Sequence, residues 1–223
     1  MKSVFPLLLL FLLASCSGRQ HLPALSGLAA GDSSQSGQIL QRCGQVFPLG
    51  DWQFVHSIEF NRGGRGGSSV IGVTTMRGRT LHCVLMTVEG LVLFEAELDQ
   101  EELETSRAIP PFDNPEFARG LMRDVQTIFL PPPGKQTETG RLEGGEFVCR
   151  YHMDNAQITD VIVAEDNGFR INVYDSDLSC TRAIVAGAGT PEATGMVPET
   201  LELTASGLSS YTLKMTLISA DKI

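Results

Sequence analysis

From Trp52 onward, the chain is divided into short runs in which apolar and polar residues alternate. The first run places Trp52, Phe54, His56, Ile58 and Phe60 at every second position. Because successive side chains of a β-strand point to opposite faces, this period of two predicts strands with one buried face and one polar face. Glycine, asparagine and aspartate separate the runs at hairpin spacing, so we expect antiparallel strands joined by short turns.

The predicted strands lie on both sides of one helical segment. They cover residues 52–60, 69–76, 81–88, 91–98 and 102–107 before it, and 141–142, 146–153, 158–164, 169–174, 198–205 and 211–218 after it. The stretch between residues 175 and 196 is rich in glycine, alanine and threonine, and we expect it to be mostly loop.

One segment follows a helical period instead. Asn114 can cap a helix, Pro115 suits its first turn, and apolar residues then recur at steps of one, three and four from Phe117 to Leu130. The prolines at 131–133 end the helix. The predicted fold is therefore mainly β (α+β), with a curved antiparallel sheet or unclosed β-barrel and this amphipathic helix as its plug or lid.

The first 15 residues have the layout of a secretory signal peptide, with Lys2, an apolar run from Val4 to Leu13, and small residues before Cys16. The sequence Leu13-Ala14-Ser15-Cys16 resembles the bacterial lipobox in residue type at each position. That resemblance implies cleavage before Cys16 and acylation of this cysteine, and several acyl chains anchor a protein stably. Ser17 points to the outer membrane by the same kind of resemblance. The alternative is a conventional signal peptide with a chance cysteine.

Composition and charge limit the domain organisation and the partners. Residues 16–50 contain a segment rich in serine, glycine and alanine, so we expect a lipidated cysteine followed by a flexible tether, and one domain over residues 51–223. The formal net charge is −9, so the surface repels phosphate backbones on average. Nucleic acid is therefore not expected as a partner.

Four cysteines remain in an oxidising compartment if Cys16 is acylated: Cys43, Cys83, Cys149 and Cys180. Four thiols allow three disulfide pairings, and the sequence does not choose among them. Their spacing contains no CxxC or CxxxH arrangement, so we expect no zinc site. We expect no metal and no other cofactor.

No sequence motif of a common enzyme class is present: GxSxG, HExxH and GxxxxGK[ST] are all absent. The histidines occur singly, at His21, His56, His82 and His152. His152 stands between Arg150 and Asp154, which we expect to lie on a solvent-exposed strand face. We therefore expect no catalytic residues, although a hydrolase assembled from distant residues is a third hypothesis.

The order of these features resembles that of the LolA/LolB lipoprotein-handling proteins: a lipobox, a tether, a first set of antiparallel strands, one amphipathic helix, and a second set of strands. Residues 54–131 look like the LolB-like lipoproteins, especially the short-turn stretch 85–98 and the helix over residues 115–130. Residues 211–217 are similar to the last strand of those proteins.

The resemblance implies an outer-membrane lipoprotein on the periplasmic side, whose unclosed barrel receives the acyl chains of a lipoprotein from a periplasmic carrier, or another apolar ligand. The expected lining of the interior is Phe54, Ile58, Phe94, Leu98, Phe147, Ile171, Leu213 and Met215. The expected lid residues on the helix are Leu121, Val125 and Ile128. The rival hypothesis is a structural or assembly lipoprotein with a filled core, because every β-sandwich also has apolar inner faces.

The resemblance also assigns a membrane-facing loop. In LolB an exposed leucine, just before a glycine on a protruding loop, assists delivery into the membrane. Here Glu89 stands at that position, between Val88 and Gly90, with Leu91 as the next apolar neighbour. An exposed carboxylate is poorly suited to entering an acyl layer. We therefore expect a LolB-like paralogue that binds some apolar envelope component.

Overall fold

The computed structural model describes residues 21–27, 33–62, 65–187, 190–192, 195–207 and 210–223. In these residues one antiparallel sheet has the strand order β1-β7-β8-β9-β10-β11-β14-β15-β2-β3-β4-β5-β6, and β12 pairs only with β13. The bounds of the strands are β1 Ser26–Gly27, β2 Trp52–Arg62, β3 Arg65–Arg77, β4 Thr80–Met86, β5 Val92–Asp99, β6 Glu102–Ala108, β7 Lys135–Arg141, β8 Phe147–His152, β9 Ile158–Val163, β10 Phe169–Tyr174, β11 Cys180–Ala186, β12 Thr190–Glu192, β13 Gly195–Val197, β14 Thr200–Ala205 and β15 Tyr211–Lys222.

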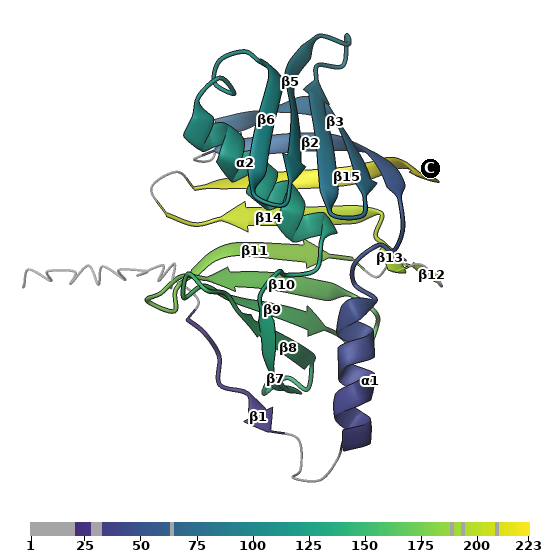
Figure 1. Cartoon of the computed structure of the whole chain (residues 1–223), viewed down its shortest axis with the longest axis vertical. Helices are drawn as coiled ribbons and strands as arrows, with labels where there is room; N and C mark the ends of the chain where they lie inside the picture. Colours follow the sequence, from purple (N-terminus) through teal and green to yellow (C-terminus); the bar gives the residue numbers. More distant parts are fainter. Residues whose placement is uncertain (1–20, 28–32, 63–64, 188–189, 193–194, 208–209) are drawn as a thin grey trace, which may run out of the picture.

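The large sheet is strongly curved and does not close, because β1 and β6 remain its two edges. Figure 1 shows β2–β6 in the upper half, β7–β11 in the lower half, and β14 and β15 joining the halves. The last strand pairs with the first long one, as Met215 lies opposite Ile58. The predicted fold class, a curved antiparallel sheet or unclosed barrel with an amphipathic helix, is confirmed.

The alternation of residue types produces the buried face of the upper half. In β4 the buried residues are Leu81, Cys83 and Leu85, while the residues between them are only half-buried. The same alternation holds at the start of β2, where Phe54 and His56 are buried. These side chains fill the concave side of the sheet, where they form one apolar core together with residues of both helices.

Helix α2 (Pro115–Phe129) connects the two halves of the sheet and lies against its concave side (Figure 1). The Asn114 side chain accepts hydrogen bonds from the backbone N–H groups of Glu116 and Phe117, which would otherwise lack partners at the helix start. Leu130 ends the helix immediately before the three prolines. The helix and its cap match the sequence prediction.

A second helix, α1 (Ser33–Gly44), lies where the sequence suggested a flexible tether. Its Cys43 forms a disulfide with Cys149 of β8, and Ile39, Val46 and Phe47 are buried. The prediction of a flexible tether is therefore wrong for residues 33–50, because three apolar side chains and one covalent bond hold this segment on the sheet. Residues 1–20, with the expected signal peptide and Cys16, lie outside the described residues. In the described part of the chain, no helix is long and apolar enough to cross a bilayer.

The prediction of mostly loop over residues 175–196 is also wrong. Strand β11 occupies part of this stretch and pairs with β10 on one side and β14 on the other. Its Cys180, Ile184 and Ala186 are buried, so small and β-branched residues here fill a central strand position.

Arg150 differs from the expectation as well, because it is buried rather than exposed. Its Nε and one Nη donate hydrogen bonds of 2.7 and 2.8 Å to the two carboxylate oxygens of Asp160. The same Nη donates to the carbonyl oxygen of Pro23 at 2.9 Å. The segment at residues 21–27 therefore covers the outer face of β8 and β9, and this cover explains why every residue of β9 is buried. His152 and Asp154 are exposed as expected.

Candidate apolar binding site

The side chains expected to line a ligand cavity all lie in or against one apolar core. Phe54, Phe94, Leu98, Ile171 and Met215 are buried members of this core. Ile58, Phe147 and Leu213 are partly buried and pack against it. Of the expected lid residues on α2, Ile128 is buried, and Leu121 and Val125 are partly buried against the same core. The structure therefore brings the predicted residues together on the concave side of the sheet.

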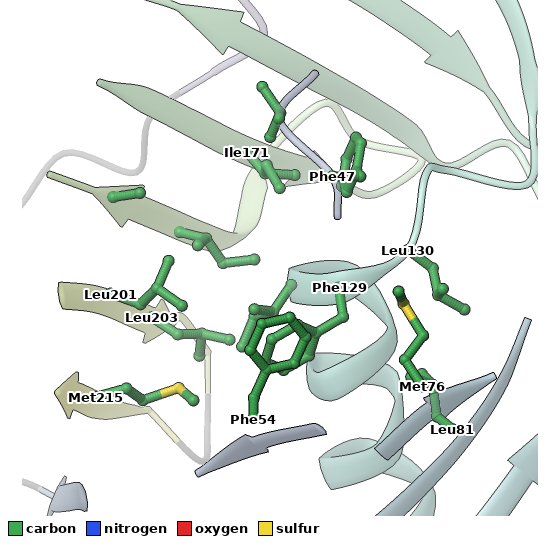
Figure 2. Packing of buried hydrophobic residues seen from close by; sticks show 14 of the residues in the cluster. Phe47, Phe54, Met76, Leu81, Phe129, Leu130, Ile171, Leu201, Leu203 and Met215 are labelled. Atoms are coloured by element: carbon green, nitrogen blue, oxygen red, sulfur yellow. The ribbon is translucent and has the colours of Figure 1, made fainter. Parts of the chain in front are cut away.

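Side chains fill the middle of this interior. The rings of Phe54 on β2 and Phe129 on α2 stack with their centroids 4.9 Å apart, and Trp52 stacks on Phe54 at 5.5 Å. Figure 2 shows Phe54 and Phe129 face to face, with Leu201, Leu203 and Met215 on one side and Met76 and Leu130 on the other. A ligand chain can enter this space only if α2 moves away from the sheet.

A small cavity of about 20 Å³ lies beside the stacked rings. Its lining is apolar apart from His56, which is 3% exposed. Among the described residues, the His56 imidazole contacts Phe54 and Phe129 but has no hydrogen-bond partner. Burial lowers the pKa of His56 to about 4, so the imidazole is neutral at pH 7. The strand alternation predicted that His56 faces inward, but no sequence pattern could show that its nitrogen atoms lack partners.

A much larger cleft, of about 640 Å³, lies between α2 with the segment that follows it, the β5–β6 turn, and the turn after β8 with the neighbouring strands β9–β11. This volume is in the usual range for small-molecule sites. The apolar lining residues are Leu98, Leu103, Met122, Leu130, Pro131, Pro132, Pro133, Met153 and Val173. The charged ones are Glu101, Arg119, Arg123, Asp124, Lys135, Asp154 and Arg182. Of the predicted lining residues only Leu98 borders the cleft, so sequence reasoning missed most of this surface.

A buried carboxylate ties α2 to the sheet at the floor of the cleft. Asp124 accepts a hydrogen bond of 2.9 Å from Nε of Arg182 on β11 and another from the hydroxyl of Tyr211 on β15. Burial raises the pKa of Asp124, while the Tyr211 hydroxyl and the Arg182 guanidinium act in the opposite direction. These three side chains hold the middle of α2 against β11 and β15.

We expect Asp124→Ala to lower the free energy of unfolding by about 1–3 kcal/mol, because it leaves the Arg182 guanidinium and the Tyr211 hydroxyl without their partner. The expected loss of unfolding free energy is limited because the Arg182 side chain is 30% exposed, so water can partly replace the carboxylate. Urea unfolding measures the change. Glu202→Ala is the matched control, since its pairing with Lys214 is long, at 3.9 Å, and exposed. Equal losses in the two variants would contradict the anchoring role of Asp124.

The expected membrane-facing residues form the tight turn between β4 and β5. Val88 is 71% exposed and Leu91 is 56% exposed, and Gly90 has a φ of +88° that favours glycine. A hydrogen bond with Thr87 lowers the pKa of Glu89, which is fully exposed and therefore ionised at pH 7. Ile109 is also exposed and lies at the same end of the sheet, since its N–H donates to the carbonyl oxygen of Leu93.

The fold has counterparts among solved structures. Neither a protein-family model nor a curated protein matches the chain. A LolA superfamily protein from Nitrosomonas europaea superposes with a TM-score of 0.51 at 11% identity, covering 84% of this chain and 93% of the other. A domain from Vibrio parahaemolyticus described as an outer membrane lipoprotein-sorting protein gives 0.51 at 9% identity, covering 82% and 90%. The chain therefore has the unclosed antiparallel fold of the LolA superfamily proteins.

Proposed function

We propose that this protein is a non-enzymatic, LolB-like outer-membrane lipoprotein that binds or transfers acyl chains of an apolar envelope component. One observation carries the proposal: an amphipathic helix covers a continuous apolar face and is bordered by an open cleft of about 640 Å³. The proteins with a similar fold include one described as sorting outer membrane lipoproteins. Cys16 is the proposed lipid anchor on the periplasmic side of that membrane.

Binding in this proposal begins in the cleft and continues under α2. An acyl chain first lies against Leu98, Met122 and Leu130, which are apolar and border the cleft. Displacement of α2 then uncovers predicted lining residues beneath it, such as Phe54, which stacks on Phe129 of this helix. Each methylene group buried there contributes about 0.8 kcal/mol. Arg119 and Lys135 at the cleft can contact polar groups of the same ligand.

A specific observation favours the rival function, a structural or assembly lipoprotein with a filled core. Beneath the lid the core side chains leave a cavity of only about 20 Å³, which is near the smallest space that holds one water molecule. If α2 never leaves the sheet, the interior serves stability alone. The two functions therefore differ in whether the purified domain takes up an acyl chain.

Native mass spectrometry of the purified domain without its lipid anchor, together with titration of the fluorescent fatty acid cis-parinaric acid, tests the proposal. We expect co-purifying acyl species and saturable binding of the probe. Thr127→Trp should weaken probe binding about tenfold or more, because Thr127 borders the cleft and the larger indole would occupy part of the space beside α2. Glu116→Trp is the matched control, as Glu116 is exposed on the same helix and does not border the cleft. A wild-type domain that carries no acyl species and binds no probe excludes the function.

We also propose that the turn carrying Val88, Glu89 and Leu91 contacts the membrane during delivery. Replacing the exposed Glu89 by leucine removes a charge that resists insertion, so Glu89→Leu should increase binding of the domain to phosphatidylethanolamine–phosphatidylglycerol vesicles severalfold. Vesicle co-sedimentation measures the bound fraction. Glu143→Leu, at an exposed position between β7 and β8, should change binding less. Equal effects of the two substitutions would argue against a special role of this turn.

A further inference from the structure

The cavity beside His56 lies between strands of the sheet, the end of α2 and two further segments of the chain. Phe54 and His56 come from β2, Ile128 and Phe129 from the end of α2, and one residue each from β10 and β14. The two further segments are residues 45–48, which contribute Val46 and Pro48, and residues 195–198, which contribute the last three of these. These two segments are in direct contact, because the Met196 N–H donates a 2.8 Å hydrogen bond to the Gln45 carbonyl oxygen. A Cβ atom on Gly195 would lie 2.3 Å from the Phe47 carbonyl oxygen, so the approach of the backbones requires glycine there. The two segments therefore cover one side of the His56 cavity.

The imidazole is the polar group in an otherwise apolar wall. The remaining lining residues are Val46, Pro48, Phe54, Ile128, Phe129, Phe169, Met196, Val197, Pro198 and Leu201, none of which carries a polar side chain. A neutral imidazole has one N–H donor and one nitrogen acceptor. A buried polar group without a partner costs about 1–3 kcal/mol, so any ligand atom that supplies a partner here recovers part of that cost.

We propose that the His56 cavity binds the carbonyl oxygen of a neutral acyl ligand, an ester or an amide, with its chain extending under α2. The inference rests on the proposed function and names the ligand class of the same interior. About 20 Å³ accommodates a single oxygen atom rather than a large head group. Phe54 and Ile128 border both the cavity and the predicted chain site, so the carbonyl group and the chain share one continuous surface.

The lining also selects against a charged head group. Among the described residues, no cationic side chain borders the cavity, and an unpaired carboxylate in an apolar site is strongly disfavoured. A hydrocarbon without a carbonyl group fills the chain site but leaves the imidazole without a partner. Esters and amides, the linkages found in acylated proteins and glycerolipids, combine a chain with a neutral acceptor. The cavity therefore distinguishes the linkage of the ligand rather than its head group.

The test compares methyl dodecanoate with tetradecane, a hydrocarbon of the same chain length, as competitors of cis-parinaric acid on the wild-type domain and on two variants. His56→Leu should weaken binding of the ester roughly fivefold and leave binding of tetradecane unchanged, because one net hydrogen bond is lost. His56→Asn, which retains a donor and an acceptor, should restore most of the ester affinity. In wild-type protein, NMR of the imidazole protons should show a shift of His56 with the ester and none with tetradecane.

Each result decides the proposal. Equal weakening of both competitors by His56→Leu shows a structural role of His56 and overturns the carbonyl site while the proposed function stands. An unchanged ester affinity in His56→Leu, or an NMR shift that tetradecane also produces, overturns it as well. If neither competitor nor the probe binds to the wild-type domain, the proposed function and this inference fail together.

Discussion

Replacing Cys43 and Cys149 together by alanine is expected to lower the free energy of unfolding by about 4 kcal/mol. The two residues are 106 positions apart, so the disulfide between them closes a long loop. In the chain-entropy description, such a loop strongly limits the conformations of the unfolded chain. Removing the bond raises the conformational entropy of the unfolded state and so favours unfolding. Helix α1 is short and has few buried residues. The disulfide is therefore more important for holding α1 on β8 than for holding the strands of the sheet together.

Urea unfolding of the oxidised wild type, the wild type in dithiothreitol, and the double variant measures this loss. The reduced wild type should lose most of what the double variant loses, and the double variant slightly more, because it also removes two buried sulfur atoms. Cys83→Ala is the matched control, because Cys83 is equally buried but has a free thiol, and its loss should be that of a small core truncation. A double-variant loss no larger than that of Cys83→Ala would show that the disulfide contributes little.

The sequence patterns that depend on one element alone predicted the structure well. In β2 and β5 the period of two places the same residues inside that the structure buries, for example Phe54 and Phe94. The cap at Asn114 and the prolines after Leu130 set the ends of α2 where they were expected. These features are local, since they follow from strand geometry, capping and the restrictions of proline.

The features that sequence reasoning missed depend on distant residues. Helix α1 has few apolar residues, and its Ile39 and Cys43 acquire a role only through the sheet and through Cys149. Arg150 is a charged residue that usually lies at the surface, but Asp160 and the Pro23 carbonyl oxygen satisfy it inside the protein. No local sequence pattern identifies such hydrogen-bond or disulfide partners, because Asp160 lies ten positions from Arg150, and Pro23 and Cys149 lie more than a hundred positions from their partners.

The residues of the candidate site also fall into those that local sequence patterns predicted and those that they did not. The period of two correctly placed Phe54, Ile171 and Met215 on the inner face, and this explains why they meet in one core. Which inner residues border open space depends instead on the curvature of the sheet and on the position of α2. The cleft is therefore bordered by residues such as Met153 and Arg182, which come from a turn and from a strand that was expected to be loop.

Acidification is expected to destabilise the protein by up to about 3 kcal/mol through His56 alone. The folded protein holds the pKa of His56 at about 4 by burial, whereas an unfolded histidine titrates near its ordinary value of 6.5. Above pH 6.5 both states are neutral, and His56 adds no pH dependence. Between pH 6.5 and 4 only the unfolded state binds the proton, so the free energy of unfolding falls by about 1.4 kcal/mol per pH unit.

Comparison of wild type with His56→Leu isolates this contribution, because other titrating groups are common to both proteins. One of them, Asp124, has a raised pKa and therefore acts in the opposite direction as the pH falls. The difference in unfolding free energy between the two proteins should be constant above pH 6.5 and should then grow in favour of the variant down to pH 4. In the part of the chain that the structure describes, no titratable side chain other than His56 borders the cavity, so no opposing charge there offsets the protonation. A difference that stays constant from pH 7 to pH 4 would mean that His56 binds a proton equally well in the folded protein, through water or movement of α2.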